Sequence, residues 1–296
     1  MATPSPPSTC AVVGVGVLGT SLCQQLLSSP DFAHVAVTGI TKTTARHDDI
    51  RKQVMSTTTA SAENEQRLRL VTTDGVVQGE RFRDVVFCAP PSGFDDYAAA
   101  VADAVENLWE GPQGGGVFCF TSSGGVYGPG DSGTVTEATP IPDPSTSPRI
   151  ERLARAEEAC RKEGGCCLRL AGLYNLNRGA HNFWLTSGKE VTGAPDGIIN
   201  LLHYEDAAAS CLATIRAGPA VCQGKVFLMS DGHPVTRRQI CEFGLKANIY
   251  KDCAMPSFAG GDCFALGKIY DGSVSNKLLQ WTPKYASFDE FMTSNA

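Results

Sequence analysis

Three features that would assign the chain to a familiar class are missing from its sequence. No apolar run approaches the roughly 18 residues of a membrane-spanning helix. The net charge of −6 has the wrong sign for a nucleic-acid-binding surface. The 12 cysteines contain no CxxC pair, so their spacing fits neither a zinc site nor a small disulfide framework. We therefore expect free thiols in a reducing compartment, no metal, no nucleic acid and no membrane.

The first nine residues, MATPSPPST, also lack the apolar core of a secretory signal. We expect residues 1–9 to be a flexible tail and the protein to be cytoplasmic, with an organelle such as a plastid left open. The expected partner is a small-molecule substrate, and the chain is expected to be a monomer or a homodimer.

Short apolar runs alternate with helical patterns along the first part of the chain. Strands rich in valine that alternate with helices favour a parallel sheet covered on both faces. The predicted class is α/β, a doubly wound parallel sheet (Rossmann) over residues 10–171, with a smaller C-terminal substrate lobe over 172–296 that is interleaved with late Rossmann strands. The expected strands are 11–15, 34–40, 68–72, 84–89, 117–121 and 166–170, and the expected helices are 17–28, 95–109 and 146–159.

Two polar stretches interrupt this pattern. Residues 56–65 are expected to form a mobile loop, and residues 128–148, rich in Pro, Gly, Ser and Thr, an ordered loop or lid. Beyond residue 171 the elements become shorter: we expect strands at 198–201 and 226–229, helices at 205–217 and 236–245, and a short helix among loops at 268–291.

The segment CAVVGVGVLG places Gly14, Gly16 and Gly19 directly after the first strand and into the first helix. This is the GxGxxG arrangement of a dinucleotide site, in which the glycines permit a tight turn, a close approach to the pyrophosphate and close packing of helix on strand. The N–H groups at the helix start, around Val17 and Leu18, then face the phosphate.

The end of the second strand indicates which dinucleotide binds. An NAD site usually has an acidic residue about 20 residues beyond the glycines. Here that place reads TGITKTTAR, and Thr41, Lys42, Thr43 and Arg46 offer hydroxyls and two cations instead. This chemistry suits a 2′-phosphate, so the sequence favours NADP(H) over NAD(H). The alternative is that Lys42 and Arg46 are solvated loop charges.

The segment FTSSGGVYG, residues 120–128, ends the fifth expected strand. Together with the glycine turn it resembles the extended short-chain dehydrogenase/reductase superfamily, which includes the NAD-dependent epimerases and dehydratases of nucleotide sugars. Further matches are LRLAGLY at 168–174, NLLHYED at 200–206 and GKIYDGS at 267–273. The resemblance covers nearly the whole chain and looks closest to the atypical YeeZ-like branch.

The resemblance implies a catalytic serine, a tyrosine that exchanges a proton, and a lysine four residues later that lowers the pKa of that tyrosine. The serine matches Ser123, but the other two positions hold Arg149 and Leu153. Arginine keeps its proton and cannot act as a general base, although it can bind a carboxylate or phosphate in a fork. We therefore expect Arg149 to anchor an anionic substrate. The alternative is a long side chain that snorkels at a helix end.

Other residues near the expected site carry weaker predictions. Ser122 is expected at the nicotinamide end, and Tyr127 is a candidate substitute acid, with simple packing on the loop as the alternative. The resemblance implies that the segment Ala89, Pro90, Pro91 passes under the adenine ribose and that Gly172, Leu173 and Tyr174 meet the nicotinamide. The expected substrate residues, besides Arg149, are Arg178 and His181 in a loop and His203, for which a structural histidine is the alternative. Asp206 is expected to cap a helix.

Two functions remain open at this point. The first is an NADP(H)-dependent oxidoreductase or epimerase-like enzyme that works on a small substrate without the usual Tyr/Lys pair. The second is a non-catalytic, nucleotide-binding regulatory or redox-sensing protein. The retained serines favour the first hypothesis, and the missing Tyr/Lys pair favours the second.

Overall fold

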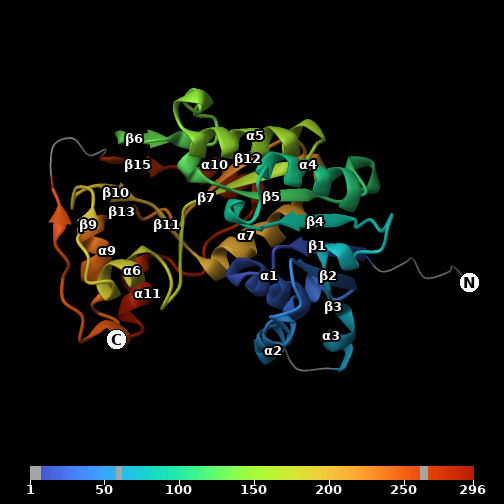
Figure 1. Cartoon of the computed structure of the whole chain (residues 1–296), viewed down its shortest axis with the longest axis horizontal. Helices are drawn as coiled ribbons and strands as arrows, with labels where there is room; N and C mark the ends of the chain where they lie inside the picture. Colours follow the sequence, from blue (N-terminus) through green and yellow to red (C-terminus); the bar gives the residue numbers. More distant parts are fainter. Residues whose placement is uncertain (1–7, 58–61, 261–265) are drawn as a thin grey trace, which may run out of the picture. The chain divides into compact units, whose positions relative to one another are not determined.

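The structure is a computed structural model that describes residues 8–57, 62–260 and 266–296. Within these residues, no helix is both long enough and apolar enough to cross a membrane. The chain folds into two units, which are drawn in Figure 1. Unit 1 comprises Met1–Ser122, Arg152–Leu168 and Ala208–Val226, and unit 2 comprises Ser123–Glu151, Arg169–Ala207 and Phe227–Ala296.

A seven-stranded parallel sheet with the strand order β12-β7-β5-β4-β1-β2-β3 confirms the predicted doubly wound class. Its order reverses direction at β1, because β1 pairs with β2 on one side and with β4 on the other. The strands are β1 (Ser8–Val13), β2 (Val35–Thr41), β3 (Leu68–Thr72), β4 (Asp84–Phe87), β5 (Phe118–Ser123), β7 (Cys166–Leu170) and β12 (Val226–Met229).

Side chains of β5 alternate between the two faces of the sheet, and helices pack against both sets of side chains. Phe118 and Phe120 share a buried cluster with residues of α4 (Tyr97–Leu108) and α5 (Pro148–Lys162). Cys119 points the other way, where its thiol hydrogen-bonds to that of Cys211 on α7 (Tyr204–Ala217). Helices α1 (Val17–Ser28), α2 (His47–Thr57), α3 (Ala62–Arg67) and α8 (Pro219–Cys222) complete this part of the chain.

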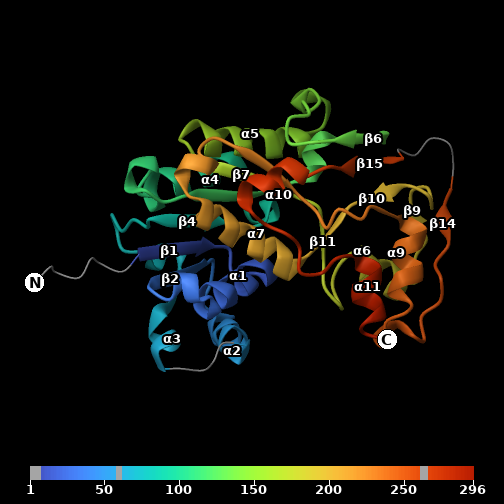
Figure 2. The same ribbon diagram turned by 180° about the vertical axis from the view of Figure 1, so that it is seen from behind.

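The described part of unit 2 contains four small two-stranded sheets. Strand β15 pairs with β6 in parallel, and the two lie side by side in both views (Figures 1 and 2). Its strands are β6 (Asp131–Val135), β8 (Gly172–Tyr174), β9 (Val191–Thr192), β10 (Ile198–Ile199), β11 (Leu201–His203), β13 (Val235–Thr236), β14 (Phe258–Ala259) and β15 (Gly267–Tyr270). Its helices are α6 (Ala180–Thr186), α9 (Arg237–Gly244), α10 (Ser273–Leu279) and α11 (Phe288–Thr293).

Several expected boundaries are wrong. The expected loop 56–65 contains the end of α2 and most of α3, and residues 58–61 lie outside the described residues. The expected loop 128–148 contains β6, because this polar segment gains backbone partners from β15. Residues 1–7 of the expected tail lie outside the described residues, whereas Ser8 and Thr9 pair with β2 as part of β1.

None of the eleven described cysteines forms a disulfide. Cys119 is fully buried, as the sequence predicted, whereas Cys88 is only half-buried because it lies beyond the end of β4.

Candidate functional site

The glycine turn after β1 has three different steric environments. Gly14 has a φ of +93°, and a Cβ there would lie 2.5 Å from the backbone of Ala89. A Cβ on Gly19 would overlap the carbonyl oxygen of Gly14, so this glycine allows α1 to pack on the turn. A Cβ on Gly16 would meet nothing within 4 Å. The open space at the turn therefore lies in front of Gly16, the N-cap residue of α1.

The start of α1 fits a phosphate group. The first N–H groups of a helix have no intrahelical acceptor, and the helix dipole favours an anion beside them. Val17 and Leu18 provide these N–H groups, and the first turn of α1 contains no acidic residue that would repel an anion. Val17 is 36% exposed, so this end of the helix is accessible.

A cavity of about 410 Å³ lies inside unit 1, next to the turn. Gly14, Thr41 and Lys42 line one part of it, and Thr73 and Val76 beyond β3 line another. The wall formed by α4 adds Ala100, Asp103, Ala104 and Asn107, where the Asn107 amide donates to the Asp103 carboxylate at 2.8 Å. A largely apolar cavity with a few polar groups suits a flat heterocycle such as a nucleotide base.

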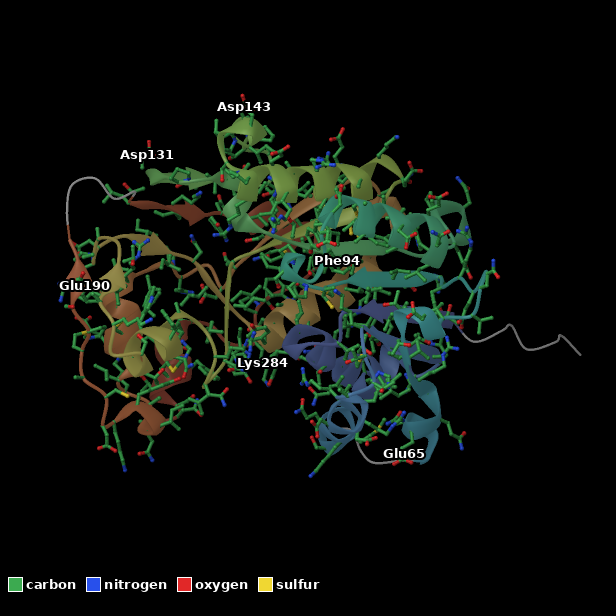
Figure 3. The ribbon with its side chains drawn as sticks, viewed as in Figure 1. Glu65, Phe94, Asp131, Asp143, Glu190 and Lys284 are labelled. Atoms are coloured by element: carbon green, nitrogen blue, oxygen red, sulfur yellow. The ribbon has the colours of Figure 1, made fainter. Side chains whose placement is uncertain are left out.

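The two predicted cations at the end of β2 differ in their surroundings. The Lys42 ammonium donates to the carbonyl of Gly93 and lies 5.3 Å from the ring centroid of Phe94. Phe94, which is labelled in Figure 3, follows β4. Arg46 is exposed at the start of α2, where its carbonyl accepts the N–H of Ile50. Lys42 is therefore held at the cavity, whereas Arg46 is exposed and is not among the residues that line the cavity.

Thr41 and Thr43 are joined by a hydrogen bond. The hydroxyl of Thr41 donates to the carbonyl of Thr43 at 2.9 Å and is 2.7 Å from Nε2 of His47, a partner that the sequence did not suggest. Of the segment after β4, the Ala89 carbonyl accepts the Tyr97 hydroxyl at 2.9 Å, and Pro90 and Pro91 begin a 3-10 turn.

The two serines at the end of β5 have different partners. Ser122 is buried, and its hydroxyl donates to the buried carboxylate of Glu157 at 2.6 Å. The Oγ of Ser123 accepts the N–H of Gly125 at 3.1 Å and remains able to donate. Among the residues that the structure describes, the Ser123 hydroxyl thus has no acceptor for its hydrogen, whereas that of Ser122 is bonded to Glu157.

Arg149 begins the inward face of α5 but is itself exposed. The rest of that face, Leu153, Ala156 and Cys160, is buried as the helical wheel predicted. A Cβ on Gly125 would lie 2.9 Å from Nη2 of Arg149 and 3.2 Å from Oγ of Ser123. Among the described residues the guanidinium has no hydrogen-bond or ion-pair partner. Arg149 therefore places an unpaired cation next to Ser123.

Tyr127 is buried, and its hydroxyl and its ring both have partners within the protein. Its hydroxyl donates to the Thr136 carbonyl at 2.7 Å, and the cations of Arg169 and Lys268 lie 4.8 and 6.0 Å from its ring centroid. These contacts favour the packing alternative that the sequence left open.

Gly172, Leu173 and Tyr174 form β8, which pairs with β11. Tyr174 is fully buried, and neither its hydroxyl nor Oδ2 of the buried Asp231 has a hydrogen-bond partner among the described residues. Burial raises the pKa of Asp231 to about 7, although its other oxygen accepts the N–H of His233.

The two candidate histidines are buried among aromatic rings. His181 lies in α6 rather than in the expected loop, its Nε2 is 3.2 Å from the Leu176 carbonyl, and burial lowers its pKa. The ring of His203 lies 4.0 Å from that of Tyr285 between centroids, and its Nδ1 accepts the N–H of Glu205. Burial lowers the pKa of His203 to about 4. These contacts match the structural-histidine alternative.

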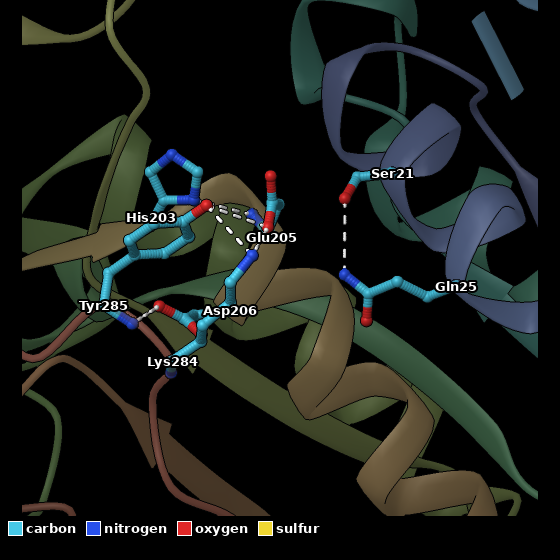
Figure 4. Close-up of polar contacts among 7 residues, drawn as sticks. All are labelled: Ser21, Gln25, His203, Glu205, Asp206, Lys284 and Tyr285. Atoms are coloured by element: carbon cyan, nitrogen blue, oxygen red, sulfur yellow. Dashed lines mark hydrogen bonds and ion pairs between the residues drawn. The ribbon is translucent and has the colours of Figure 1, made fainter. Parts of the chain in front are cut away.

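Asp206 lies in the first turn of α7, and its carboxylate accepts the N–H groups of Lys284 and Tyr285 at 2.6 and 3.1 Å (Figure 4). The same segment 284–285 is held a second time by Glu205, which bonds to both side chains. Arg178 is exposed, and its Nε donates to the Tyr204 hydroxyl at 3.0 Å.

Sequence reasoning missed a tyrosine at this site. Tyr270, at the end of β15, places its ring against Gly124, the residue after Ser123. The matching segment GKIYDGS was recognised, but nothing in it indicated that this side chain reaches the end of β5.

The fold is shared with solved structures of dehydratases and epimerase-like proteins, whereas no family model and no curated protein matches the chain. A dTDP-glucose 4,6-dehydratase from Streptomyces venezuelae, DesIV, with NAD bound, is 18% identical with a TM-score of 0.72, over 97% of this chain and 95% of that chain. The human epimerase family protein SDR39U1, solved with NADPH, is 12% identical with a TM-score of 0.70, over 97% of this chain and 99% of that chain. A conserved protein of unknown function from Silicibacter pomeroyi is 18% identical with a TM-score of 0.69, over 97% of both chains.

Proposed function

We propose that this chain binds NADP(H) and is an oxidoreductase or epimerase-like enzyme for a small anionic substrate, working without the Tyr/Lys pair that the sequence resemblance implies. The observation that carries the proposal is the glycine turn with open space at Gly16, next to a cavity whose rim holds Lys42 and no acidic residue of β2. The DesIV dehydratase was solved with NAD and the human SDR39U1 with NADPH, which supports a dinucleotide in this fold.

In this proposal each part of the site has one task. The N–H groups of Val17 and Leu18 bind the pyrophosphate, and the cavity holds the adenosine. Lys42 and Arg46 bind the 2′-phosphate, and Arg149 binds the anionic group of the substrate in a fork. When bound, the nicotinamide supplies or accepts a hydride.

Equilibrium titration with NADPH and NADH, followed by nicotinamide fluorescence, tests the cofactor assignment. We expect tighter binding of NADPH than of NADH. Lys42→Ala and Arg46→Ala should each reduce the difference between the two binding free energies by more than the ~0–1 kcal/mol of an ordinary surface ion pair. Lys42 should have the larger effect, since it is held at the cavity.

Two further variants complete this experiment. Lys52→Ala removes an exposed lysine of α2 that does not line the cavity, and it should leave the difference unchanged. Gly16→Val places a side chain where the pyrophosphate must approach, so both affinities should fall sharply while the fold survives. Equal affinities for the two dinucleotides, unaffected by Lys42→Ala and Arg46→Ala, would contradict the NADP(H) assignment.

A non-catalytic sensor is the competing function. It is favoured by one observation, the arginine and the buried leucine at positions 149 and 153. A sensor binds NADPH but does not oxidise it with any carbonyl compound, so the turnover experiment below separates the two functions.

A further inference from the structure

Strand β15 carries Tyr270 to the end of β5, although about 150 residues separate them in sequence. Its pairing with β6 sets Tyr270 opposite Val135. The buried Asn200 fixes this strand from the other side, because its amide donates to the Lys268 carbonyl at 2.7 Å and its Oδ1 accepts the N–H of Tyr270 at 2.9 Å. The Lys268 ammonium also donates to the carbonyl of Gly128, which ties β15 to the chain after β5.

Two consecutive glycines make room for two side chains at this point. A Cβ on Gly124 would lie 2.5 Å from Cε2 and Cζ of Tyr270 and would overlap its hydroxyl oxygen. A Cβ on Gly125 would lie 2.9 Å from Nη2 of Arg149. Real Cβ contacts are essentially never closer than 3.0 Å, so a side chain at Gly124 would displace the Tyr270 ring, and one at Gly125 would displace the flexible end of Arg149. Tyr270, Arg149 and Ser123 therefore converge on one short turn.

The polar groups of these side chains are available for a ligand. Among the residues that the structure describes, the Tyr270 hydroxyl has no hydrogen-bond partner, and the same holds for the Arg149 guanidinium. The neighbouring Tyr127, whose ring centroid lies 6.1 Å from that of Tyr270, instead donates to the Thr136 carbonyl. Tyr270 is half-buried rather than enclosed.

The charge state of Tyr270 also suits a proton donor. Burial and, to a smaller extent, the nearby Tyr127 raise its pKa to about 12, although the Arg149 cation acts in the opposite direction. The phenol is therefore protonated at neutral pH, and Arg149 stabilises the phenolate that forms when the proton leaves.

We propose that Tyr270 is the proton-transfer group of this site, in place of the tyrosine that position 149 lacks. The assignment rests on the proposed function and names its substrate class, a small carbonyl compound with a carboxylate. The carboxylate binds to Arg149, and the carbonyl oxygen accepts a hydrogen bond from Ser123.

The carbonyl carbon receives a hydride from the reduced nicotinamide dinucleotide, which becomes oxidised, and a C–H bond forms. The π electrons of the carbonyl move to its oxygen, which takes the phenolic proton of Tyr270. The product is a hydroxy acid, and the Tyr270 phenolate regains a proton from water.

Turnover of 4-carboxybenzaldehyde, followed by the loss of NADPH absorbance, tests the assignment. We expect Tyr270→Phe to lower kcat by roughly 10²–10⁴-fold, the usual contribution of a general acid, with little change in KM or in NADPH affinity. Arg149→Ala should raise KM for this aldehyde but not for benzaldehyde, which has no carboxylate. Tyr285→Phe is the matched control, because its hydroxyl bonds to Glu205 instead, and kcat should be retained.

Binding of 4-(hydroxymethyl)benzoate, the product, gives a readout without turnover. In calorimetric titration of the chain without nucleotide, Tyr270→Phe should weaken binding by roughly 2- to 13-fold, the value of one hydrogen bond. Gly124→Ala serves as a second variant, since the added methyl group displaces the Tyr270 ring, and it should reproduce the loss of kcat.

The outcomes separate this assignment from the proposed function. A wild-type chain that binds NADPH but does not reduce 4-carboxybenzaldehyde contradicts the enzymatic function, and the role of Tyr270 falls with it. If the wild type is active and Tyr270→Phe is fully active too, the role of Tyr270 in proton transfer is refuted and the proposed function is not. The same holds if kcat is lost in Tyr127→Phe and retained in Tyr270→Phe.

Discussion

Replacing Asp231 by asparagine should stabilise the protein, and more so at alkaline pH. Asp231 follows β12, its side chain is 6% exposed, and its Oδ2 has no hydrogen-bond partner among the described residues. Its Oδ1 accepts the N–H of His233 at 2.8 Å, a bond that an asparagine oxygen also accepts. The substitution therefore removes a buried charge and retains the main hydrogen bond.

The magnitude follows from the pKa of Asp231, which burial raises from 3.8 to about 7. Between pH 3.8 and about pH 7, this carboxyl group is therefore protonated in the folded chain but ionised in the unfolded chain. Stability therefore falls as the pH rises from 4 to 7, and the penalty is complete above 7. It amounts to about 2 kcal/mol at pH 5.5 and about 4 kcal/mol at pH 8.5. The advantage of Asp231→Asn over the wild type should grow by about 2 kcal/mol between these pH values.

Urea denaturation at both pH values measures this difference, because the free energy of unfolding extrapolates linearly to zero denaturant. Titrating groups that do not interact with Asp231 affect both proteins equally, so comparison of variant with wild type isolates Asp231 and the groups coupled to it, His233 and Asp206. An advantage that is independent of pH, or that is larger at pH 5.5, would refute the claim that a buried charge at Asp231 opposes folding.

Two further predictions concern the glycine turn and the thiols. Gly14→Ala should lower the free energy of unfolding much more than Gly79→Ala. Both glycines have a positive φ, but only Gly14 lies against a backbone, that of Ala89. Equal losses of unfolding free energy in urea denaturation would contradict the steric reason. A thiol reagent applied under denaturing, non-reducing conditions should find nearly all 12 cysteines free, and bridges in freshly purified protein would overturn the expectation of a reducing compartment.

Local sequence patterns predicted the elements whose residues decide their own structure. The range of β3 and that of α1 were predicted to the residue, because an apolar run and a helical repeat depend on near neighbours alone. The buried face of α5 followed from the same periodicity. The steric roles of Gly14 and Gly19 were readable too, since a GxGxxG turn is defined within six residues.

Contacts between distant segments were decided only in the tertiary structure. Residues 128–148 are polar enough to be a loop, yet β6 forms there because β15 supplies its backbone partners. The side chain of His203 is of a type that titrates near neutral pH, but the rings of Tyr285 and Phe291 bury it. Nothing local in GKIYDGS indicates that Tyr270 meets Gly124, because that contact depends on the register of β15 against β6 and on the amide of Asn200. The sequence by itself determined the sheet and its glycine turn. The tertiary structure decided which tyrosine lies beside Ser123, because the neighbours of a side chain across long loops are not encoded in any local repeat.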